Sequence, residues 1–357
     1  MTTDTAPRRR TTRMPDGRPA VRLGVGAVRV QFTLRTGVVV GALLIVALIA
    51  AILALRIGDY PLTLTEVLSA LAGDNSQFSY VVVMEWRLPR TIAGLVFGAA
   101  LGVSGALFQS LTRNPLGSPD VIGLSAGSYT GALVALIFVG SSATTLSTGG
   151  LIGGFLTAAL IYLFAYRRGT SRFRLIIVGI GLSAMLTAAN NYLLLVANLD
   201  LAMVGAAWGA GSIDQITWSE VTPPLVVIAV ALLLCIVASR PLGAMALGDD
   251  AARAFGIKVE KARGAIVLLA VALTAVVAAT AGPIAFVALA APQLARRMTA
   301  SAGIALVPSA AMGACLLCVS DFVAAQLFGN IPVGLVTVGI GGVYLVWLLI
   351  HESRRSA

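Results

Sequence analysis

Residues Thr91 to Leu111 read TIAGLVFGAALGVSGALFQSL, an apolar run without a charged side chain. A helix of about 20 largely apolar residues is long enough to cross the hydrocarbon core of a bilayer. Glycine, of which the chain has 38, suits helices that approach one another closely in lipid. We therefore expect a membrane-spanning helix at this position.

The rest of the chain has the same character. Of its 357 residues, 58% are apolar and 11% are charged, and the mean hydropathy is +0.94. An ordinary soluble domain carries about 25% charged residues. Since such a chain cannot hide its apolar surface by folding in water, the composition predicts an all-α membrane protein.

Ten stretches qualify as candidate spans, of which the eighth is short. They are Val38–Leu55, Thr91–Leu111, Val121–Val139, Gly149–Tyr166, Leu175–Val196, Val221–Ala238, Gly264–Ala281, Ile284–Arg296, Ile304–Leu327 and Val333–Ile350. With the N-terminus placed in the cytoplasm, 22 of the 25 Lys and Arg residues fall on the cytoplasmic side. Only Arg56, Arg87 and Arg90 lie outside, so the positive-inside rule predicts ten spans with both termini cytoplasmic.

The net charge of +10 comes largely from the ends of the spans and from the first 36 residues, so it indicates no nucleic-acid partner. Residues 1–36 are basic and rich in Pro and Thr, without apolar periodicity, and are predicted to form a disordered cytoplasmic tail. Residues 37–351 form the predicted transmembrane domain, and residues 352–357 a short cytoplasmic tail. Outside the membrane, Pro61 to Ala72 reads as an amphipathic helix with a threonine N-cap.

The sequence Arg87-Leu-Pro-Arg90 lies at the outer mouth of the second span, on the side that otherwise lacks basic residues. The two arginines can anchor the helix end by snorkelling. Alternatively, because an Arg fork suits bidentate contact with carboxylates, they form a docking point for an external partner.

Two further segments differ from generic membrane helix. Between spans six and seven, Asp249 to Phe255 reads as a short helix with acid early and base late, as the helix dipole favours. This connection is longer than a plain one needs, which favours a lever seated in another protein over a solvated loop. Between spans two and three, Gln109 to Ser128 holds two prolines and three glycines, and such irregular backbone must be sheltered by protein or face a water-filled cavity.

Together these segments resemble the FecCD-type family of iron-siderophore and cobalamin ABC permeases. The motifs that carry the resemblance appear in order along the chain. They are RLPR at Arg87–Arg90, GAALGVSGALFQ at Gly98–Gln109, RNPLGSP and IGLSAGS within Arg113–Ser128, LGDDAARAFG at Leu247–Gly256, GPIAFVALAAPQLAR at Gly282–Arg296 and IPVGLVTVGIGG at Ile331–Gly342.

The resemblance implies a type II ABC importer permease fold of ten helices in the bacterial inner membrane, which pairs with a second permease and two ATPase subunits. It also implies a periplasmic or lipid-anchored binding protein, whose acidic residues would meet Arg87 and Arg90. Six residues would form the coupling helix that contacts the ATPase: Leu247, Gly248, Asp249, Ala252, Arg253 and Gly256. The only lysines, Lys258 and Lys261, do not follow glycine, so the chain has no phosphate-binding loop and we expect no catalysis and no cofactor.

Polar residues inside spans mark a candidate translocation path. Ser183, Thr187, Asn190 and Asn191 recur at roughly helical spacing in the fifth span, where interhelical hydrogen bonding explains them equally well. Asp321 is an ionisable group near the outer end of span nine. The pair Cys315 and Cys318 lies within an apolar run and reads as packing residues, with no metal site expected.

The chain also departs from the family pattern. The family usually has Arg where Ala325 stands, His at Gln293, and an acidic residue or Gln at Asn330; Gln326 follows Ala325. The missing Arg predicts an asymmetric complex with a paralogous permease. The resemblance favours ferric siderophores over cobalamin or haem as substrate. An ion-coupled secondary carrier is the alternative from another class, although the spans lack the central carboxylate or His that ion coupling needs.

Overall fold

The computed structural model describes residues 10–13, 19–25, 28–75, 78–165, 172–301, 303–329 and 331–356. Beyond a small sheet near the N-terminus, the described chain is helical. The helices are α1 (Leu34–Arg56), α2 (Leu64–Leu71), α3 (Phe78–Val81), the π-helix η1 (Val82–Arg87), α4 (Leu88–Thr112), α5 (Leu124–Phe138), α6 (Ala143–Ala165), α7 (Arg172–Val196), α8 (Leu199–Gly209), α9 (Trp218–Ala246), α10 (Asp249–Ala254), α11 (Val259–Ala281), α12 (Val287–Thr299), α13 (Leu306–Leu327) and α14 (Val333–Ser356).

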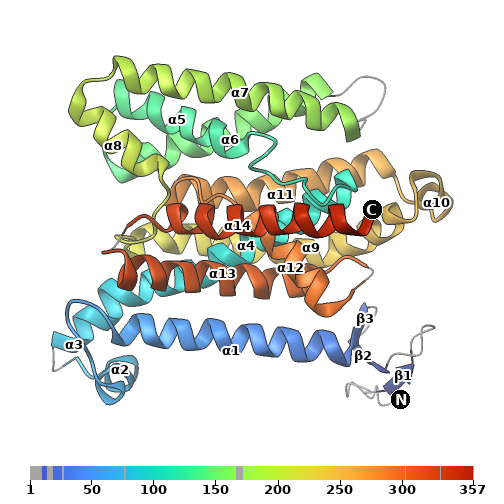
Figure 1. Cartoon of the computed structure of the whole chain (residues 1–357), viewed down its shortest axis with the longest axis horizontal. Helices are drawn as coiled ribbons and strands as arrows, with labels where there is room; N and C mark the ends of the chain where they lie inside the picture. The colour runs from blue at the N-terminus through green and yellow to red at the C-terminus, as the bar shows by residue number, and fades with distance from the viewer. Residues whose placement is uncertain are drawn as a thin grey trace, which may run out of the picture.

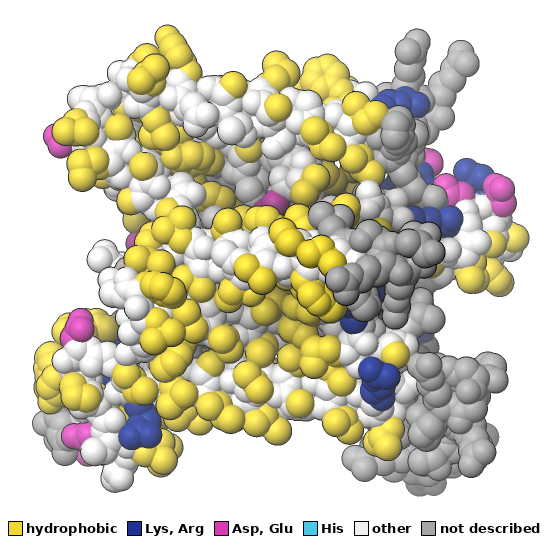
Figure 2. Space-filling model, viewed as in Figure 1, with side chains coloured by type: hydrophobic (Ala, Val, Ile, Leu, Met, Phe, Trp, Pro, Cys, Tyr) yellow, Lys and Arg dark blue, Asp and Glu magenta, His cyan; other side chains and the backbone are white. Residues whose placement is uncertain are grey.

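The long helices lie side by side along the long axis of the molecule, and their connections lie at two opposite ends (Figure 1). One end carries α2 and α3, and the other carries α10, the start of α1 and the end of α14. We call them the α2 end and the α10 end. Hydrophobic side chains cover the flanks between them, whereas most charged side chains gather towards the ends (Figure 2).

A helix overlaps each of the ten predicted spans. Among the described residues, seven helices are long and apolar enough to cross a membrane, and they include the continuous helix Phe78–Thr112. The helix α5 and the apolar part of α14, Val333–Trp347, are shorter. The eighth predicted span corresponds to α12, a helix of 13 residues. The all-helical membrane fold is therefore confirmed, while the count of ten spans stays a prediction.

Helix α4 forms the centre of the bundle. It packs against α13 and α12 on one side and against α11 and α9 on the other, and 78% of the most apolar window in Phe78–Thr112 is buried. Helices α5, α6, α7 and α8 form a neighbouring group, and α1 packs on the outer side of α13. This arrangement places both ends of α4 next to the connections of several other helices.

Glycines allow α4 to touch its neighbours backbone to backbone. A methyl group at Gly98 would overlap the backbone of Gly313 in α13, and one at Gly102 would overlap the carbonyl of Ser309. At Gly105 the obstacle is the carbonyl oxygen of Ala288 in α12. Such contacts hold helices together in lipid, where burying an apolar side chain gains little.

Buried hydroxyl groups add hydrogen bonds across the same interface. The Ser104 Oγ of α4 donates to the carbonyl of Ala270 in α11 at 2.7 Å and lies 2.7 Å from Thr274 Oγ1. Ser104 and Thr274 are both fully buried. These two hydroxyl groups therefore have partners on a neighbouring helix or on their own backbone, as a lipid-embedded site requires. The buried hydroxyl oxygens of Ser128 and Ser309, by contrast, have no hydrogen-bond partner among the described residues.

Within the stretch predicted to be a disordered tail, the structure describes three strands, at residues 10–13, 19–25 and 28–33. Arg10–Arg13 (β1), Pro19–Val25 (β2) and Val28–Thr33 (β3) form an antiparallel sheet in the order β1-β2-β3. Its register pairs alternating apolar positions, with Val21 opposite Phe32 and Leu23 opposite Val30. An apolar residue at every second position is the pattern of a strand. In the sequence this pattern is hard to recognise, because arginines stand between the apolar residues.

The outer amphipathic helix predicted in Pro61 to Ala72 is confirmed as α2. Thr63 is its N-cap, and its Oγ1 accepts a hydrogen bond from the Glu66 backbone N–H at 3.3 Å. The Glu66 carboxylate in turn accepts the Thr63 backbone N–H at 2.7 Å. This reciprocal capping box stabilises the start of the helix.

Replacing Gly105 by Ala should lower the melting temperature of the protein in detergent by several degrees, because the added methyl group overlaps the Ala288 carbonyl. Overpacking of this kind costs about 1–3 kcal/mol. Gly37→Ala is the matched control, since a methyl group there meets no atom within 4 Å. Equal melting temperatures for both variants, measured by fluorescence-detected size-exclusion chromatography, would contradict the close contact.

Candidate functional site

Arg87 ends the π-helix η1 and turns towards the end of α1. Its Nη1 donates to the carbonyl of Leu55 at 2.8 Å, and its Nη2 donates to the carbonyl of Tyr60 at 2.7 Å. The guanidinium also lies against Gly58, where a Cβ would meet Nη2 at 2.8 Å. Arg87 thus ties the start of the second span to the connection that follows α1.

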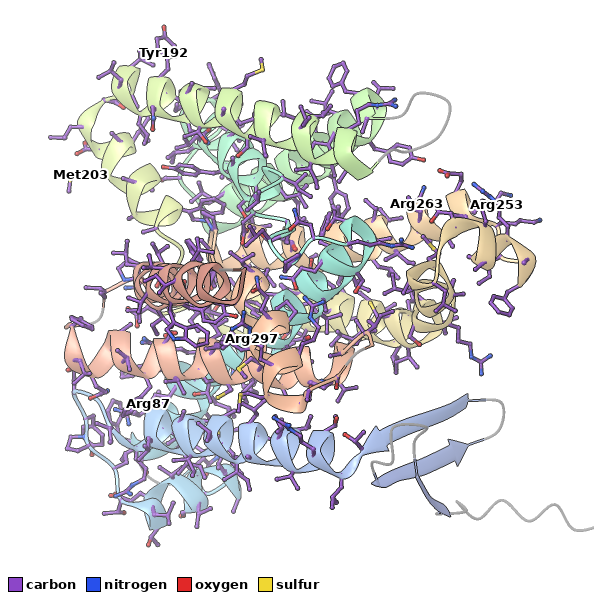
Figure 3. The ribbon with its side chains drawn as sticks, turned by 45° about the vertical axis from the view of Figure 1, so that its right-hand side comes forward. Arg87, Tyr192, Met203, Arg253, Arg263 and Arg297 are labelled. Atoms are coloured by element: carbon purple, nitrogen blue, oxygen red, sulfur yellow. The ribbon has the colours of Figure 1, made fainter. Side chains whose placement is uncertain are left out.

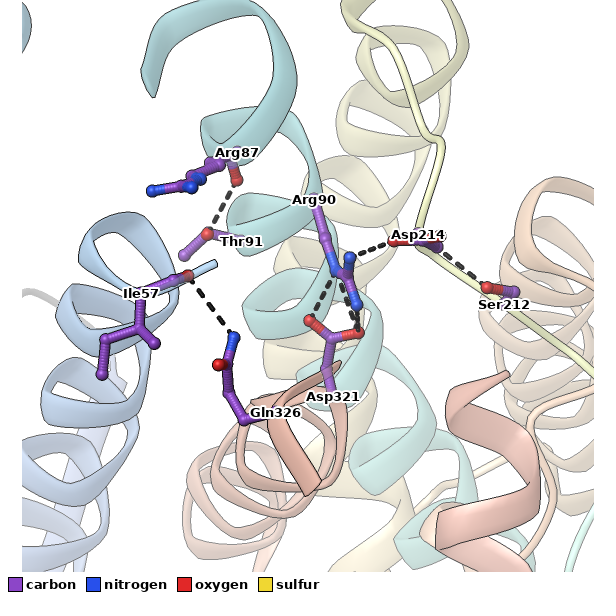
Figure 4. Close-up of polar contacts among 8 residues, drawn as sticks. All are labelled: Ile57, Arg87, Arg90, Thr91, Ser212, Asp214, Asp321 and Gln326. Carbon is purple, nitrogen blue, oxygen red and sulfur yellow. Dashed lines mark hydrogen bonds and ion pairs between the residues drawn. The ribbon is translucent and has the colours of Figure 1, made fainter. Parts of the chain in front are cut away.

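Arg90, one turn further on, points in another direction (Figure 4). Its Nε donates to Asp321 Oδ2 at 2.9 Å, and its Nη2 donates to Asp321 Oδ1 at 3.0 Å. Its Nη1 donates to Asp214 Oδ1. One guanidinium therefore joins α4, α13 and the segment between α8 and α9 at the α2 end.

Pro89 gives a physical reason for the wide π-helical turn that ends at Arg87. A proline inside a helix has no N–H, and its ring crowds the carbonyl four residues earlier. The chain relieves this crowding through η1, in which the Leu88 N–H donates to the carbonyl of Val83, five residues back. Arg87 and Arg90 bond to different neighbours and do not form one fork.

A cavity of about 470 Å³ lies next to both arginines. Asp214, Asp321, Ala325 and Gln326 are among the residues that line it. The Gln326 amide reaches towards the carbonyl of Ile57 at 3.4 Å, whereas Ala325 contributes only a methyl group. The position where the family usually has Arg therefore faces this cavity, while Asn330 lies outside the described residues.

At the opposite end, α10 confirms the short helix predicted from Asp249 to Phe255. Its first residue, Asp249, binds a buried arginine, Arg263, that was not predicted from the sequence. Arg263 of α11 is 6% exposed, and its Nη2 donates to Asp249 Oδ2 at 2.7 Å. Its Nη1 donates to Glu260 Oε1 at 3.0 Å. Figure 3 shows Arg263 at the base of α10 and Arg253 on its outer part.

Two large apolar side chains flank α10 and point away from the bundle. Leu247 is 74% exposed and Phe255 is 69% exposed. Gly248 and Gly256, with φ of +129° and +77°, supply the turns before and after the helix. Leu247 belongs to the predicted coupling set, but Phe255 does not. The sequence feature that could have identified Phe255 is an aromatic residue next to a glycine in the most polar of the inner connections.

The connection between α4 and α5 is irregular, as predicted, and it is sheltered by protein. The Gln293 amide of α12 donates to the carbonyl of Pro115 at 2.7 Å. Asp120 accepts a hydrogen bond from Ser125 Oγ, and its Oδ2 is buried without a hydrogen-bond partner among the described residues. Burial raises the pKa of Asp120 to about 6, although hydrogen bonds from Ser125 and from the Phe286 backbone act to lower it.

The four residues of the candidate path do not share one environment. Asn190 is 3% exposed and donates to the carbonyl of Ala126 in α5 at 3.1 Å. Thr187 and Asn191 are exposed, and Thr187 Oγ1 donates to the carbonyl of Ser183 within α7. Ser183 packs against Gly123. For Asn190 the structure shows the interhelical hydrogen bond that the sequence offered as the alternative.

Comparison with known proteins identifies the chain. The model of the FecCD transport family matches residues 43–351. The chain belongs to the FecCD transport family. This membership, together with the apolar helices, makes it a multi-pass inner-membrane permease of an ABC importer, and it excludes the ion-coupled carrier.

Two relatives come from Escherichia coli K12. The ferric enterobactin transport system permease protein FepG is 46% identical over 310 residues, which cover 86% of this chain and 94% of FepG. The ferric enterobactin transport system permease protein FepD is 31% identical over 325 residues, covering 90% of this chain and 97% of FepD.

A solved structure supports the same assignment. It is described as an inward-facing conformation of a metal-chelate type ABC transporter, and it superposes with a TM-score of 0.76 at 28% sequence identity. The match covers 88% of this chain and 99% of the other. The predicted family and helical permease fold are thereby confirmed, and so is the assignment as a transport subunit and not an enzyme.

The raised pKa of Asp120 predicts a pH-dependent stability. The folded protein favours the protonated carboxyl. The contribution of Asp120 to the free energy of unfolding is therefore fully present below pH about 4 and is lost as the pH rises to about 6. The loss amounts to about 3 kcal/mol. Melting temperatures in detergent between pH 4 and 7 should fall more for the native chain than for Asp120→Asn. Parallel pH profiles would contradict the burial of this carboxylate.

Arg263 should matter far more than Arg253 for holding α10 in place. Arg263→Met leaves Asp249 and Glu260 without their buried cation, whereas Arg253→Met removes only an exposed bond to Asp250 at 2.7 Å. Exposed pairs of this spacing contribute about 0.3–0.5 kcal/mol. Limited proteolysis should cleave near α10 several-fold faster in Arg263→Met, and similar rates in both variants would refute the bracing role.

Proposed function

We propose that this chain forms half of the translocation pathway of an ATP-driven importer for ferric siderophores. The name and the 46% identity of FepG support this substrate class. FepG and FepD are two permease proteins of one named system, and this chain is more similar to the first than to the second. This supports a heterodimer with a paralogous permease, joined by two ATPase subunits and a binding protein.

The observation that carries the proposal is the exposed apolar surface around α10. Leu247 and Phe255 lie at the end of the molecule where basic residues gather, beyond the apolar flanks that face lipid. Exposed large apolar side chains of this kind mark sites of protein contact. The proposed contact is a groove on the ATPase, with Gly248, Asp249, Ala252, Arg253 and Gly256 shaping the helix between them.

The brace through Arg263 makes this surface suitable for transmitting force. A surface that couples nucleotide hydrolysis to helix movement must move together with the span behind it. The ion pair between Arg263 and Asp249 joins α10 to α11, which packs against the central helix α4. Movement of the ATPase would therefore reach the core of the permease.

At the α2 end we propose that Arg90 and Arg87 receive the binding protein. Both arginines lie beside the outer cavity of about 470 Å³, and carboxylates are the groups that a guanidinium binds most strongly. On α7, Thr187 and Asn191 are proposed to line the pathway with the partner permease, because they are exposed polar groups one turn apart. Ser183 and Asn190 lie beside them on the same face of the helix, where Ser183 packs against Gly123 and Asn190 donates to the carbonyl of Ala126.

Leu247→Arg should abolish both ATPase association and ATP-dependent uptake of a ferric siderophore in reconstituted vesicles. The charge replaces an apolar contact, while the exposed position leaves folding unchanged. Phe255→Arg should act in the same way, and Lys261→Ala, an exposed change on α11, serves as the control. Pull-down of the ATPase by Leu247→Arg at native levels would overturn the coupling role. Uptake driven by an ion gradient without the ATPase would overturn the proposed function itself.

A further inference from the structure

The two carboxylates that bind Arg90 are not equivalent. Asp321 receives two nitrogens, Nε and Nη2, and its side chain is only 8% exposed. Asp214 receives the third, Nη1, and its side chain is 23% exposed. Asp321 is therefore the buried, bidentate partner that orients the guanidinium, whereas Asp214 occupies the side that faces outward.

Cavities give an outside group access to the Asp214 side of the guanidinium. Asp214 lines the cavity of about 470 Å³ together with Arg87 and Arg90. It also lines a second cavity, of about 440 Å³, whose walls include Ser212, Gln215 and Glu220. A side chain entering the first cavity from the α2 end would meet Asp214 and Arg90 at the same point.

The segment that carries Asp214 is joined to two other connections at this end. The Gly334 N–H, at the start of α14, donates to the carbonyl of Gly211 at 2.9 Å. The Ser212 N–H donates to the carbonyl of Ala281, the last residue of α11, at 2.7 Å. Gly282 and Gly211, both with a φ of +71°, let these backbones approach without a side chain between them.

We propose that Asp214 occupies, on Arg90, the place that a carboxylate of the binding protein takes on docking. This inference rests on the proposed docking role of Arg90. The incoming carboxylate replaces Asp214 at Nη1, while Asp321 keeps its two nitrogens, so the charge and the hydrogen bonds at the guanidinium are conserved. The exchange removes the ion pair that joins the segment 211–217 to α4, while Ile213 of the segment stays buried in the core. The loosened segment then transmits the docking event to the start of α14 and the end of α11.

An internal competitor lowers the affinity of the resting permease for its partner. Removing the charge of Asp214 should therefore raise that affinity, which is the opposite of what loss of an ordinary docking residue does. A partly exposed competing ion pair makes the expected gain about tenfold at low salt. Raising the salt should reduce the difference, since exposed charges are screened.

The test measures binding of the substrate-binding protein from the same transport system to the permease complex in nanodiscs. Asp214→Asn should bind about tenfold tighter than the native complex. Asp200→Asn is the matched control, because Asp200 is an exposed acid at the start of α8, outside both cavities. Its affinity should change less than twofold, and Asp321→Asn should bind more weakly because Arg90 loses its orienting partner.

A second measurement follows the segment itself. A spin label attached at Gln215→Cys reports its mobility, because the Gln215 side chain is exposed and the three native cysteines are buried. Adding the binding protein should increase the mobility of the label in the native background. In the Asp214→Asn background, the label should already be mobile before the binding protein is added.

The outcomes separate the two proposals. If Arg90→Glu binds the partner as the native complex does, Arg90 is no docking residue, and both the docking role and the exchange are wrong. If Arg90→Glu weakens binding but Asp214→Asn matches Asp200→Asn or binds more weakly than the native complex, docking stands and the exchange is overturned. An unchanged label mobility on docking would also overturn the exchange.

Discussion

Where α4 meets α13 and α12, glycines bring the helix backbones so close that one added methyl group would overlap a carbonyl oxygen. In lipid, apolar side chains gain little by leaving the solvent, so close contact and buried hydrogen bonds must hold the bundle together. The Gly105 contact with Ala288 and the Ser104 bonds to α11 show both kinds of interaction. They fix α4 as the reference against which the other helices are placed.

Both ends to which we assign a function depend on that fixed central helix. Its first turn holds Arg90 between Asp321 and Asp214, and its last turn leads into the connection that contains Asp120. A guanidinium at the rim of a membrane helix is expensive to bury and is satisfied here by carboxylates of two distant segments. The arginines at the α2 end therefore connect segments of the permease to one another even when no partner is bound.

The coupling surface that we propose at the α10 end has to meet a different requirement. A surface that receives force from another protein must be apolar enough to bind and rigid enough to move as one piece with the span behind it. Leu247 and Phe255 supply the apolar surface, and the buried Arg263 supplies the rigidity through Asp249. A short helix of six residues could not supply this rigidity alone, because isolated helices of that length are unstable in water.

The sequence alone determined the membrane class, the position of each long helix, the α2 cap and the short helix α10, because apolar runs and capping residues act over a few neighbouring residues. It also contains, in the expected order, the motifs that indicate the family. The partners of Arg87, Arg90 and Arg263 were decided only by the tertiary structure. Asp321 lies 231 residues from Arg90 in sequence, and no local pattern states which distant carboxylate a guanidinium will meet. That choice follows from the backbone contacts that set where the helices cross.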